Sequence, residues 1–409
     1  AFSQRTISGK IVNAATSEPI AGSSVFISNT SFGTVTNKDG YFEITDIPSG
    51  KYDLIISSIG YETSVYNFST DKLPIKLRVE MQVKVRELEN VTIEPSVEEG
   101  WEKWGNAFLT NFVGQTANAK NCKIKNEKSI RFRFFRKSNR LVAYSDEPII
   151  LENKALGYII KYQLENFEVN YKTHTTLFVG YPLFEEIDKH RKGLQRRWQK
   201  NRDKAYYGSM MHFMQSIYNN NLAAEGFEVR RMVREPNLEK QRIKKLYRPA
   251  RLTGSVKIVS NGNRPLTIQT PDSLSTDSSA YYERILSQED NIDTYGRALL
   301  NADSLIAEQQ GEFKILFFEN YLYVTYKREL EDVEYLEYFH ERRSPTFQRS
   351  HIWLQNLQPI AIDPNGSYFP PQEIFSMSYW GFNEKMSNLL PLDYKPYSPA
   401  PELKSGVIK

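Results

Sequence analysis

The sequence GKIVNAATSEPIAGSSVFISNTSFGTVTNKDGYFEITDIPSGKYDLIISSIGYE, residues 9–62, decides the fold of the first part of the chain. Short apolar runs in it alternate with polar residues, which is the period of half-buried strands. Turn-forming residues interrupt the runs at positions 17–19, 37–40, 48–50 and 59–60. This spacing is typical of a β-sandwich. The alternation recurs at residues 76–81, so we predict a sandwich over residues 5–93.

Length and composition limit the remaining possibilities. A chain of 409 residues is longer than the chains that usually fold around a single hydrophobic core, so we expect two or three domains. Hydrophobic residues make up 40% and charged residues 25%, as in folded soluble proteins. The mean hydropathy is −0.54, and no apolar run is long enough for a membrane-spanning helix. The single cysteine, Cys122, permits no intramolecular disulfide, and we expect it to be a small buried residue.

The quoted stretch resembles the carboxypeptidase regulatory-like domain, a transthyretin-like β-sandwich. The resemblance implies an accessory module that packs and docks, without catalysis. Such modules follow the catalytic domain of some metallocarboxypeptidases and precede many outer-membrane nutrient transporters on the periplasmic side. Only Ser23, where the family usually has alanine, departs from its pattern. The matching positions are Gly9, Pro19, Gly22, Val25, Gly33, Thr36, Asn37, Asp39, Gly40, Phe42, Pro48, Gly50, Tyr52, Leu54, Gly60 and Tyr61.

Beyond the sandwich the pattern changes to mixed helices and strands. We therefore predict an N-terminal β-sandwich followed by a larger mixed α+β domain over residues 96–394, with a possible sub-boundary near 250. Residues 395–409 contain Pro396, Pro399 and Pro401 and are expected to be an extended tail. Residues 152–158, 180–185 and 197–209 resemble the body of a family of envelope proteins from glycan-degrading Gram-negative bacteria. That resemblance implies a location in the envelope and no reaction.

Local patterns predict the main elements of this larger domain. Ser96 is a candidate cap for a helix whose stripe of Trp101, Trp104, Phe108 and Phe112 packs on a sheet. Strands 156–164 and 167–179 are expected to turn at Glu165-Asn166. The other expected elements are a hairpin over 130–144, helices over 184–225 with buried Tyr206, Met210, Phe213 and Ile217, a strand starting at Phe227, a hairpin over 255–270, a polar loop over 272–279, and strands at 314–318, 321–326, 350–354 and 359–362.

The first residues carry an export-like pattern. Ala1-Phe2-Ser3 before Gln4 is similar to the small-x-small end of a secretory signal peptide, with cleavage expected near Ser3. A bacterial lipoprotein would carry a lipid-bearing cysteine at this point, and none is present. We therefore expect a periplasmic, outer-membrane-associated protein that is not lipid-anchored. A trimmed chain is the alternative explanation of this start.

Motifs for catalysis and cofactors are missing from the sequence. The five histidines are His174, His190, His212, His340 and His351, and none has the His-x-x-Glu or His-Glu-x-x-His spacing of a zinc peptidase. Phosphate-binding loops and a Gly-x-Ser-x-Gly elbow are also missing. We therefore predict a protein that is not an enzyme and needs no cofactor or metal, with His212 in the core. A pair of carboxylates that meet in space as a glycosidase pair stays an alternative. Ser273 and Ser304 each lie in an Asp-Ser-Leu triplet that fits an O-glycosylation pattern.

The most unusual charge feature is a basic run at residues 189–204. It holds eight basic residues and one acid, Asp203, whereas the whole chain has a formal charge of +4. A second basic run comprises Lys240, Arg242, Lys244, Lys245, Arg248 and Arg251. Such runs bind acidic partners or anionic lipid and lipopolysaccharide surfaces, or they are solvated faces paired with acids elsewhere. Trp198 could anchor at an interface or pack in the core. The candidate interaction surface is Lys189, Arg191, Lys192, Arg196, Arg197, Trp198, Lys200, Arg202 and Lys204.

Three hypotheses of function follow. The first is a non-enzymatic periplasmic accessory or scaffold subunit that docks on an outer-membrane β-barrel complex for barrel assembly, secretion or TonB-dependent transport. The second is a carbohydrate- or cell-surface-binding protein, and the third is an unrecognised hydrolase. Nucleic acid is not an expected partner, because no recognition motif accompanies the basic residues.

Overall fold

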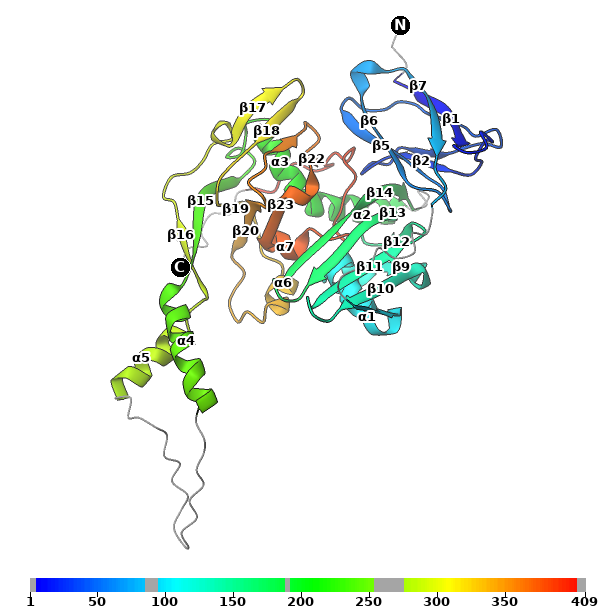
Figure 1. Ribbon diagram of the computed structural model, residues 1–409. Coiled ribbons are helices and arrows are strands. Elements are labelled where there is room, and N and C mark those ends of the chain that lie inside the picture. Colours follow the sequence, from blue (N-terminus) through cyan, green and yellow to red (C-terminus); the bar gives the residue numbers. More distant parts are fainter. Residues whose placement is uncertain (1–4, 85–94, 188–191, 254–275, 403–409) are drawn as a thin grey trace. The chain divides into compact units, whose positions relative to one another are not determined.

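The computed structural model describes residues 5–84, 95–187, 192–253 and 276–402 of the chain (Figure 1). They fall into two compact units. The main unit comprises residues 1–229 and 299–409, and the inserted unit comprises residues 230–298. The division therefore has two boundaries, after Val229 and before Leu299, where the sequence suggested one near 250. Within the described ranges, every helix is too short or too polar to cross a membrane.

The main unit begins with the predicted β-sandwich. One of its sheets has the strand order β4-β1-β7, and the other has the order β3-β2-β5-β6. Ile7, Ile11, Val25, Ile27 and Leu54 point between the sheets and are fully buried, as the alternating pattern predicts. The strands are β1 (Ile7–Asn13), β2 (Ser24–Ile27), β3 (Gly33–Val35), β4 (Tyr41–Ile44), β5 (Lys51–Ser57), β6 (Ser64–Ser69) and β7 (Ile75–Met81).

The turn at residues 37–40 explains the densest part of the family pattern. The Asn37 side chain accepts hydrogen bonds from the amides of Asp39 at 3.0 Å and Tyr41 at 2.9 Å. Gly40 has a φ of +75°, and a Cβ there would lie 2.5 Å from the Ile11 carbonyl oxygen. Glycine is therefore required at this position. The predicted turn is confirmed.

The second part of the main unit is a seven-stranded antiparallel sheet covered by α1 (Trp101–Phe108) (Figure 1). Phe108 and Phe112 are fully buried, and the Trp104 ring stacks on Phe134 at 4.9 Å, so the predicted aromatic stripe is confirmed. The half-buried Cys122 packs at the edge of this core. The strands are β8 (Ser96–Glu99), β9 (Cys122–Ile124), β10 (Ile130–Phe135), β11 (Arg140–Ser145), β12 (Ile149–Asn153), β13 (Tyr158–Asn170) and β14 (Thr175–Glu186).

Two sequence expectations for this sheet are wrong. Ser96 caps no helix: it begins β8, which pairs with β10, and Gly100 is the N-cap of α1. Glu165-Asn166 is not a turn, because β13 continues through an irregularity at this point and keeps pairing with β14. In both places pairing with a neighbouring strand outweighs the local cap or turn propensity.

The third part of the main unit packs α3 (Met210–Tyr218), α6 (Val333–Tyr338) and α7 (Tyr379–Asn383) around further strands. Strands form near the predicted positions 314–318 and 321–326, and they belong to different sheets. β19 (Tyr321–Leu330), β20 (Phe347–Leu354) and β23 (Ile374–Ser378) lie side by side, and the other sheet contains β17 (Ile306–Gln310), β18 (Phe313–Leu316), β21 (Ile360–Ile362) and β22 (Tyr368–Phe369).

The helical region predicted over residues 184–225 begins later than expected, because β14 extends to Glu186. It contains α2 (Lys192–Tyr206) and α3. Tyr206, Met210, Phe213 and Ile217 are all buried, although the stripe is divided between the two helices. A strand starts at Phe227 as predicted.

The inserted unit combines a hairpin with two helices. β15 (Phe227–Pro236) enters it and pairs with β16 (Asn291–Tyr295), and its helices are α4 (Leu238–Thr253) and α5 (Thr276–Leu286). Residues 276–279 are therefore helical and not the loop that their polarity predicted. The hairpin predicted over residues 255–270 lies outside the described residues.

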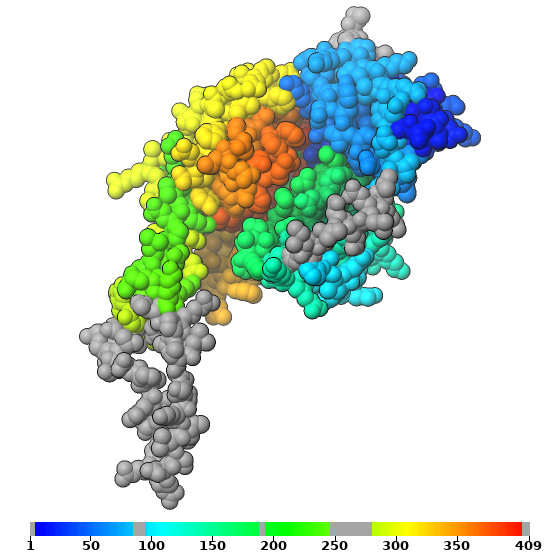
Figure 2. Space-filling view, in the orientation of Figure 1, coloured from blue at the N-terminus to red at the C-terminus, as the bar shows by residue number. Residues whose placement is uncertain are grey.

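The sandwich is attached to the body of the main unit by contacts with β14, and Figure 2 shows these two parts of the unit packed together. Leu183 packs on Phe26 and Ile55, which point away from the core of the sandwich. The Asn29 amide donates to the Pro182 carbonyl at 2.9 Å, and the Phe184 amide donates to the Thr30 carbonyl at 3.0 Å. The outer face of the β2–β5 pair is therefore occupied by this chain itself.

Candidate functional site

The basic run of the sequence lies mainly on α2. Lys189 and Arg191 fall outside the described residues, and Lys192 is the first residue of the helix. The other predicted surface residues divide into a buried pair, one ion-paired lysine and three exposed cations.

Trp198 and Arg202 are not part of an exposed surface, which corrects the sequence prediction. Trp198 is 6% exposed and Arg202 is 7% exposed. The Trp198 indole donates to the Lys154 carbonyl at 3.0 Å, and the Arg202 Nε donates to the Leu156 carbonyl at 2.7 Å. Both side chains therefore fix α2 to the turn that follows β12.

The setting of Arg202 explains why this charge can be buried. Its guanidinium forms an ion pair with Glu186 at 2.8 Å and lies 3.9 Å from the centre of the Tyr158 ring. A buried guanidinium needs such partners to offset the loss of hydration. Gly157, beside it, has a φ of +73°, and a Cβ there would lie 2.3 Å from the Trp198 ring. The periodicity of charge along the sequence cannot distinguish such an arginine from a solvated one.

Lys204 is also engaged within the chain. Its Nζ forms an ion pair with Asp332 at 2.7 Å. Burial opposes the charged form, but the hydrogen bond and charge of Asp332 prevail and raise the pKa of Lys204. Lys204 thus helps to hold α2 against the start of α6.

Arg196, Arg197 and Lys200 are the predicted surface residues that remain exposed. Among the described residues they have no ion-pair partner. Arg196 and Lys200 line a groove of about 600 Å³ beside the C-terminal segment, which we define as residues 392–398. We call this the basic groove; its lining residues are Gln195, Arg196, Gln199, Lys200, Tyr397 and Ser398.

Asp203 positions the far wall of the basic groove. Its carboxylate accepts hydrogen bonds from the Tyr394 hydroxyl at 2.5 Å and from the amides of Tyr397 at 2.8 Å and Ser398 at 2.9 Å. Burial and the hydrogen bond to Asp203 raise the pKa of Tyr394. Tyr397 itself stays 76% exposed, so its ring is available at the groove.

No local pattern in the sequence indicates the contact of Asp203 with the segment that contains Tyr397. The proline-rich residues are predicted to form an extended tail, and in the described part of this tail the Ser398 carbonyl accepts from Tyr207 at 2.7 Å and the Pro401 carbonyl accepts from Arg328 at 2.5 Å. The pairing of Asp203 with residues about 190 positions away is a tertiary contact. Only the presence of one acid within a strongly basic helix could have drawn attention to it.

Three of the six residues in the second basic run form ion pairs inside the inserted unit. Lys240 and Lys244 both form ion pairs with Asp290, at 2.9 and 2.7 Å, and Arg242 pairs with Glu239 at 2.6 Å. The hydrogen bond from Arg242 lowers the pKa of Glu239 to about 2. This run therefore offers less free positive charge than its sequence indicates.

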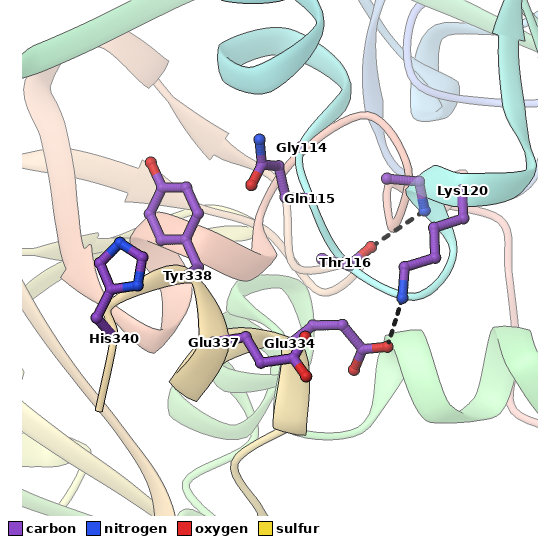
Figure 3. A pocket seen from close by; sticks show the side chains of 9 residues that line it. Gly114, Gln115, Thr116, Lys120, Glu334, Glu337, Tyr338 and His340 are labelled. Atoms are coloured by element: carbon purple, nitrogen blue, oxygen red, sulfur yellow. Dashed lines mark hydrogen bonds and ion pairs between the residues drawn. The ribbon is translucent and has the colours of Figure 1, made fainter. Parts of the chain in front are cut away.

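A second hollow of about 660 Å³ lies between the segment that follows α1 and the end of α6 (Figure 3). We call it the polar hollow. Lys120 reaches Glu334 across it at 3.2 Å. Its lining residues are Gly114, Gln115, Thr116, Ala119, Lys120, Glu334, Glu337, Tyr338 and His340.

His212 lies in the core, as predicted. It is 2% exposed, its Nδ1 accepts from the Gly208 amide at 3.2 Å, and its Nε2 faces a Glu225 carboxylate oxygen at 3.2 Å. Burial lowers the pKa of His212 to about 4. Across the described ranges, no group of three or more His, Cys, Asp and Glu side chains is arranged to hold a metal ion. Ser304 is exposed and donates to the Asn301 carbonyl at 2.7 Å, and Ser273 lies outside the described residues.

These features define an N-terminal β-sandwich domain joined to an α+β body with surface hollows. Residues 7–93 match the CarboxypepD_reg-like domain, so the chain carries a carboxypeptidase regulatory-like domain at its N-terminus. The resemblance seen in the sequence is confirmed for this part of the chain. None of the curated proteins matches the chain.

Several solved structures show local likeness. A cohesin–X-dockerin complex from Acetivibrio cellulolyticus is 32% identical over 19% of this chain and 57% of that chain, with a TM-score of 0.16. The Bacillus anthracis TIE protein is 14% identical over 46% and 32% of the two chains, with a TM-score of 0.17. A DUF3823 family protein from Bacteroides uniformis is 13% identical over 46% and 86%, with a TM-score of 0.14. This chain thus spans little more than half of the first of these, and at such TM-scores none informs its function.

Proposed function

We propose that this protein is a non-enzymatic accessory subunit of the bacterial envelope that docks on an outer-membrane β-barrel complex through its basic groove. The protein would reside in the periplasm, associated with the outer membrane. The complex would serve barrel assembly, secretion or TonB-dependent transport. No catalytic step and no cofactor belong to this proposal.

The exposed cations of α2 carry the proposal. Arg202 and Lys204 of the same helix have acidic partners within the chain, whereas Arg196, Arg197 and Lys200 have none among the described residues. Unpaired cations at one surface attract an acidic partner and raise its rate of association. Tyr397 adds an exposed aromatic ring beside them, and tyrosine and arginine are enriched where proteins bind each other.

The attachment of the sandwich supports a scaffold role. Ser31 donates to the Asp393 carboxylate through its amide at 3.0 Å and its hydroxyl at 2.6 Å. The Leu392 amide donates to the Asn29 carbonyl at 2.6 Å. The C-terminal segment therefore ties a loop of the sandwich to the end of α2. A subunit built in this way would present its groove as part of a rigid body.

Co-purification from detergent-solubilised outer membranes tests the proposal. The native protein should bring down a large barrel protein in a defined ratio. Recovery as a free monomer would overturn the proposal. So would retention by protein-free vesicles of phosphatidylethanolamine and phosphatidylglycerol to the same extent as by membranes, since that result would indicate an anionic lipid surface as the partner.

A further inference from the structure

The polar hollow has a lining that differs from that of the basic groove. One side of the hollow is formed by residues 114–120, which follow α1. The other side is formed by α6 and His340 (Figure 3). At about 660 Å³ it falls in the size range of small-molecule sites. It belongs to the main unit throughout.

The charges at this hollow disfavour anionic ligands. Lys120 and Glu334 form an ion pair at 3.2 Å, and their side chains are 68% and 24% exposed. This pair leaves Glu337 as the remaining carboxylate of the lining, which repels an anion. Lys120 lies on the segment opposite α6, and Glu334 offsets its charge. The lining therefore disfavours an anionic ligand and is compatible with a neutral one.

The polar groups of the hollow supply both donors and acceptors. Gln115 offers an amide, Glu337 offers a carboxylate and His340 offers an imidazole. His340 follows the end of α6, and its amide donates to the Glu337 carbonyl at 3.2 Å, so the two side chains come from one short turn. Hydroxyl groups, which donate and accept at once, match such a mixed lining.

Tyr338 supplies an aromatic wall. It is 42% exposed, and its ring packs against Phe339 at 4.8 Å and Phe382 at 5.5 Å. These contacts limit the motion of the ring while leaving part of it open. An aromatic ring with a polar surround binds ligands that have one apolar face and many polar edges.

We infer that the polar hollow binds an uncharged oligosaccharide. The C–H face of one sugar ring would lie on Tyr338, and its hydroxyls would bind Gln115, Glu337 and His340. The site goes beyond the docking proposed for the basic groove and involves none of the residues of that groove.

Isothermal titration calorimetry of the full chain with cellohexaose, xylohexaose, maltohexaose, laminarihexaose and chitohexaose tests this inference. At least one of these probes should bind, and Tyr338→Ala should weaken that binding by about tenfold or more, since about 1.4 kcal/mol of lost contact corresponds to a factor of ten. Glu337→Gln should weaken it while leaving the thermal unfolding unchanged. Phe369→Ala is the matched control, because Phe369 is an exposed aromatic residue of the same unit, 60% exposed, that does not line the hollow.

Three results would overturn the inference. The first is the failure of every one of these probes to bind. The second is an equal loss of binding in Phe369→Ala and Tyr338→Ala. The third is tighter binding of a galacturonic acid hexamer than of any neutral probe, which would indicate that charge governs recognition at this hollow.

Discussion

The carboxylate of Asp203 and the hydroxyl of Tyr394 lie 2.5 Å apart, so a hydrogen bond joins the end of α2 to the C-terminal segment. The same carboxylate accepts the amides of Tyr397 and Ser398. One buried acid inside the most basic helix of the chain thus holds the far wall of the basic groove. Removing its carboxylate should leave three donors without their acceptor.

Asp203→Ala should lower the free energy of unfolding by about 3 kcal/mol, because buried donors would lose a charged acceptor. Urea denaturation measures this change. Hydrogen exchange at Tyr397 and Ser398 should become faster, as the segment detaches. Asp146→Ala, which removes an acid that is 49% exposed, should change the stability by less than about 0.5 kcal/mol. Equal effects of the two substitutions would contradict the role of Asp203.

Arg202 and Arg197 lie in the same basic run, yet their substitution should change the free energy of unfolding by very different amounts. Arg202→Met should cost about 3 kcal/mol or more, since Glu186 would lose its ion-pair partner and two carbonyls would lose their donor. Arg197→Met removes an exposed side chain and should change the stability by less than about 0.5 kcal/mol. Thermal unfolding of the two variants compares them directly, and an equal shift in Tm would contradict the structure.

The attachment of the sandwich can be tested at Leu183. Leu183→Asp would place a carboxylate against Phe26 and Ile55, where it has no hydration. We expect the sandwich and the body to unfold together in one calorimetric transition in the native chain, and in two separate transitions in the variant. Leu357→Asp at a 57% exposed position is the control and should keep one transition.

Acid should destabilise the protein through His212. Its pKa is lowered from 6.5 to about 4 by burial, so the unfolded state binds the proton more tightly than the folded state. The contribution of neutral His212 to the free energy of unfolding is fully present above pH 6.5. This contribution is lost as the pH falls from 6.5 towards 4. A loss on the order of 2 kcal/mol is expected over this range. The pH dependence of Tm should be weaker in His212→Gln, and an unchanged slope would contradict the assignment.

The fold of the sandwich could be predicted from the sequence because its information is local. Turn residues such as Asn37 and Gly40, and alternating strands such as residues 76–81, need no distant partner to be recognised. The body was harder to predict. Ser96 and Glu165 have the propensities of a cap and a turn, yet strand pairing across the sheet decides both positions.

In the candidate site, too, features set by local sequence could be predicted and features set by distant contacts could not. The basic helix could be predicted from the sequence. Which of its residues are buried could not: Trp198 and Arg202 bind the backbone carbonyls of residues 154 and 156, whereas Arg196 and Lys200 are exposed. The stretches 152–158 and 197–209 are in contact with each other, because α2 packs on the turn that follows β12. Asp203 and Tyr397 escaped notice because their roles depend on chain segments far apart in sequence.

Charge reversal at the basic groove tests the central claim most directly. The double substitution Arg196→Glu with Lys200→Glu should abolish co-purification with a barrel protein from solubilised outer membranes, while thermal unfolding stays unchanged. The matched control reverses Lys123 and Lys128, two exposed lysines on the same unit, and should retain the barrel protein. Loss of the partner in the groove variant alone is the predicted result. Undiminished recovery of the barrel protein with Arg196 and Lys200 both reversed would contradict the account.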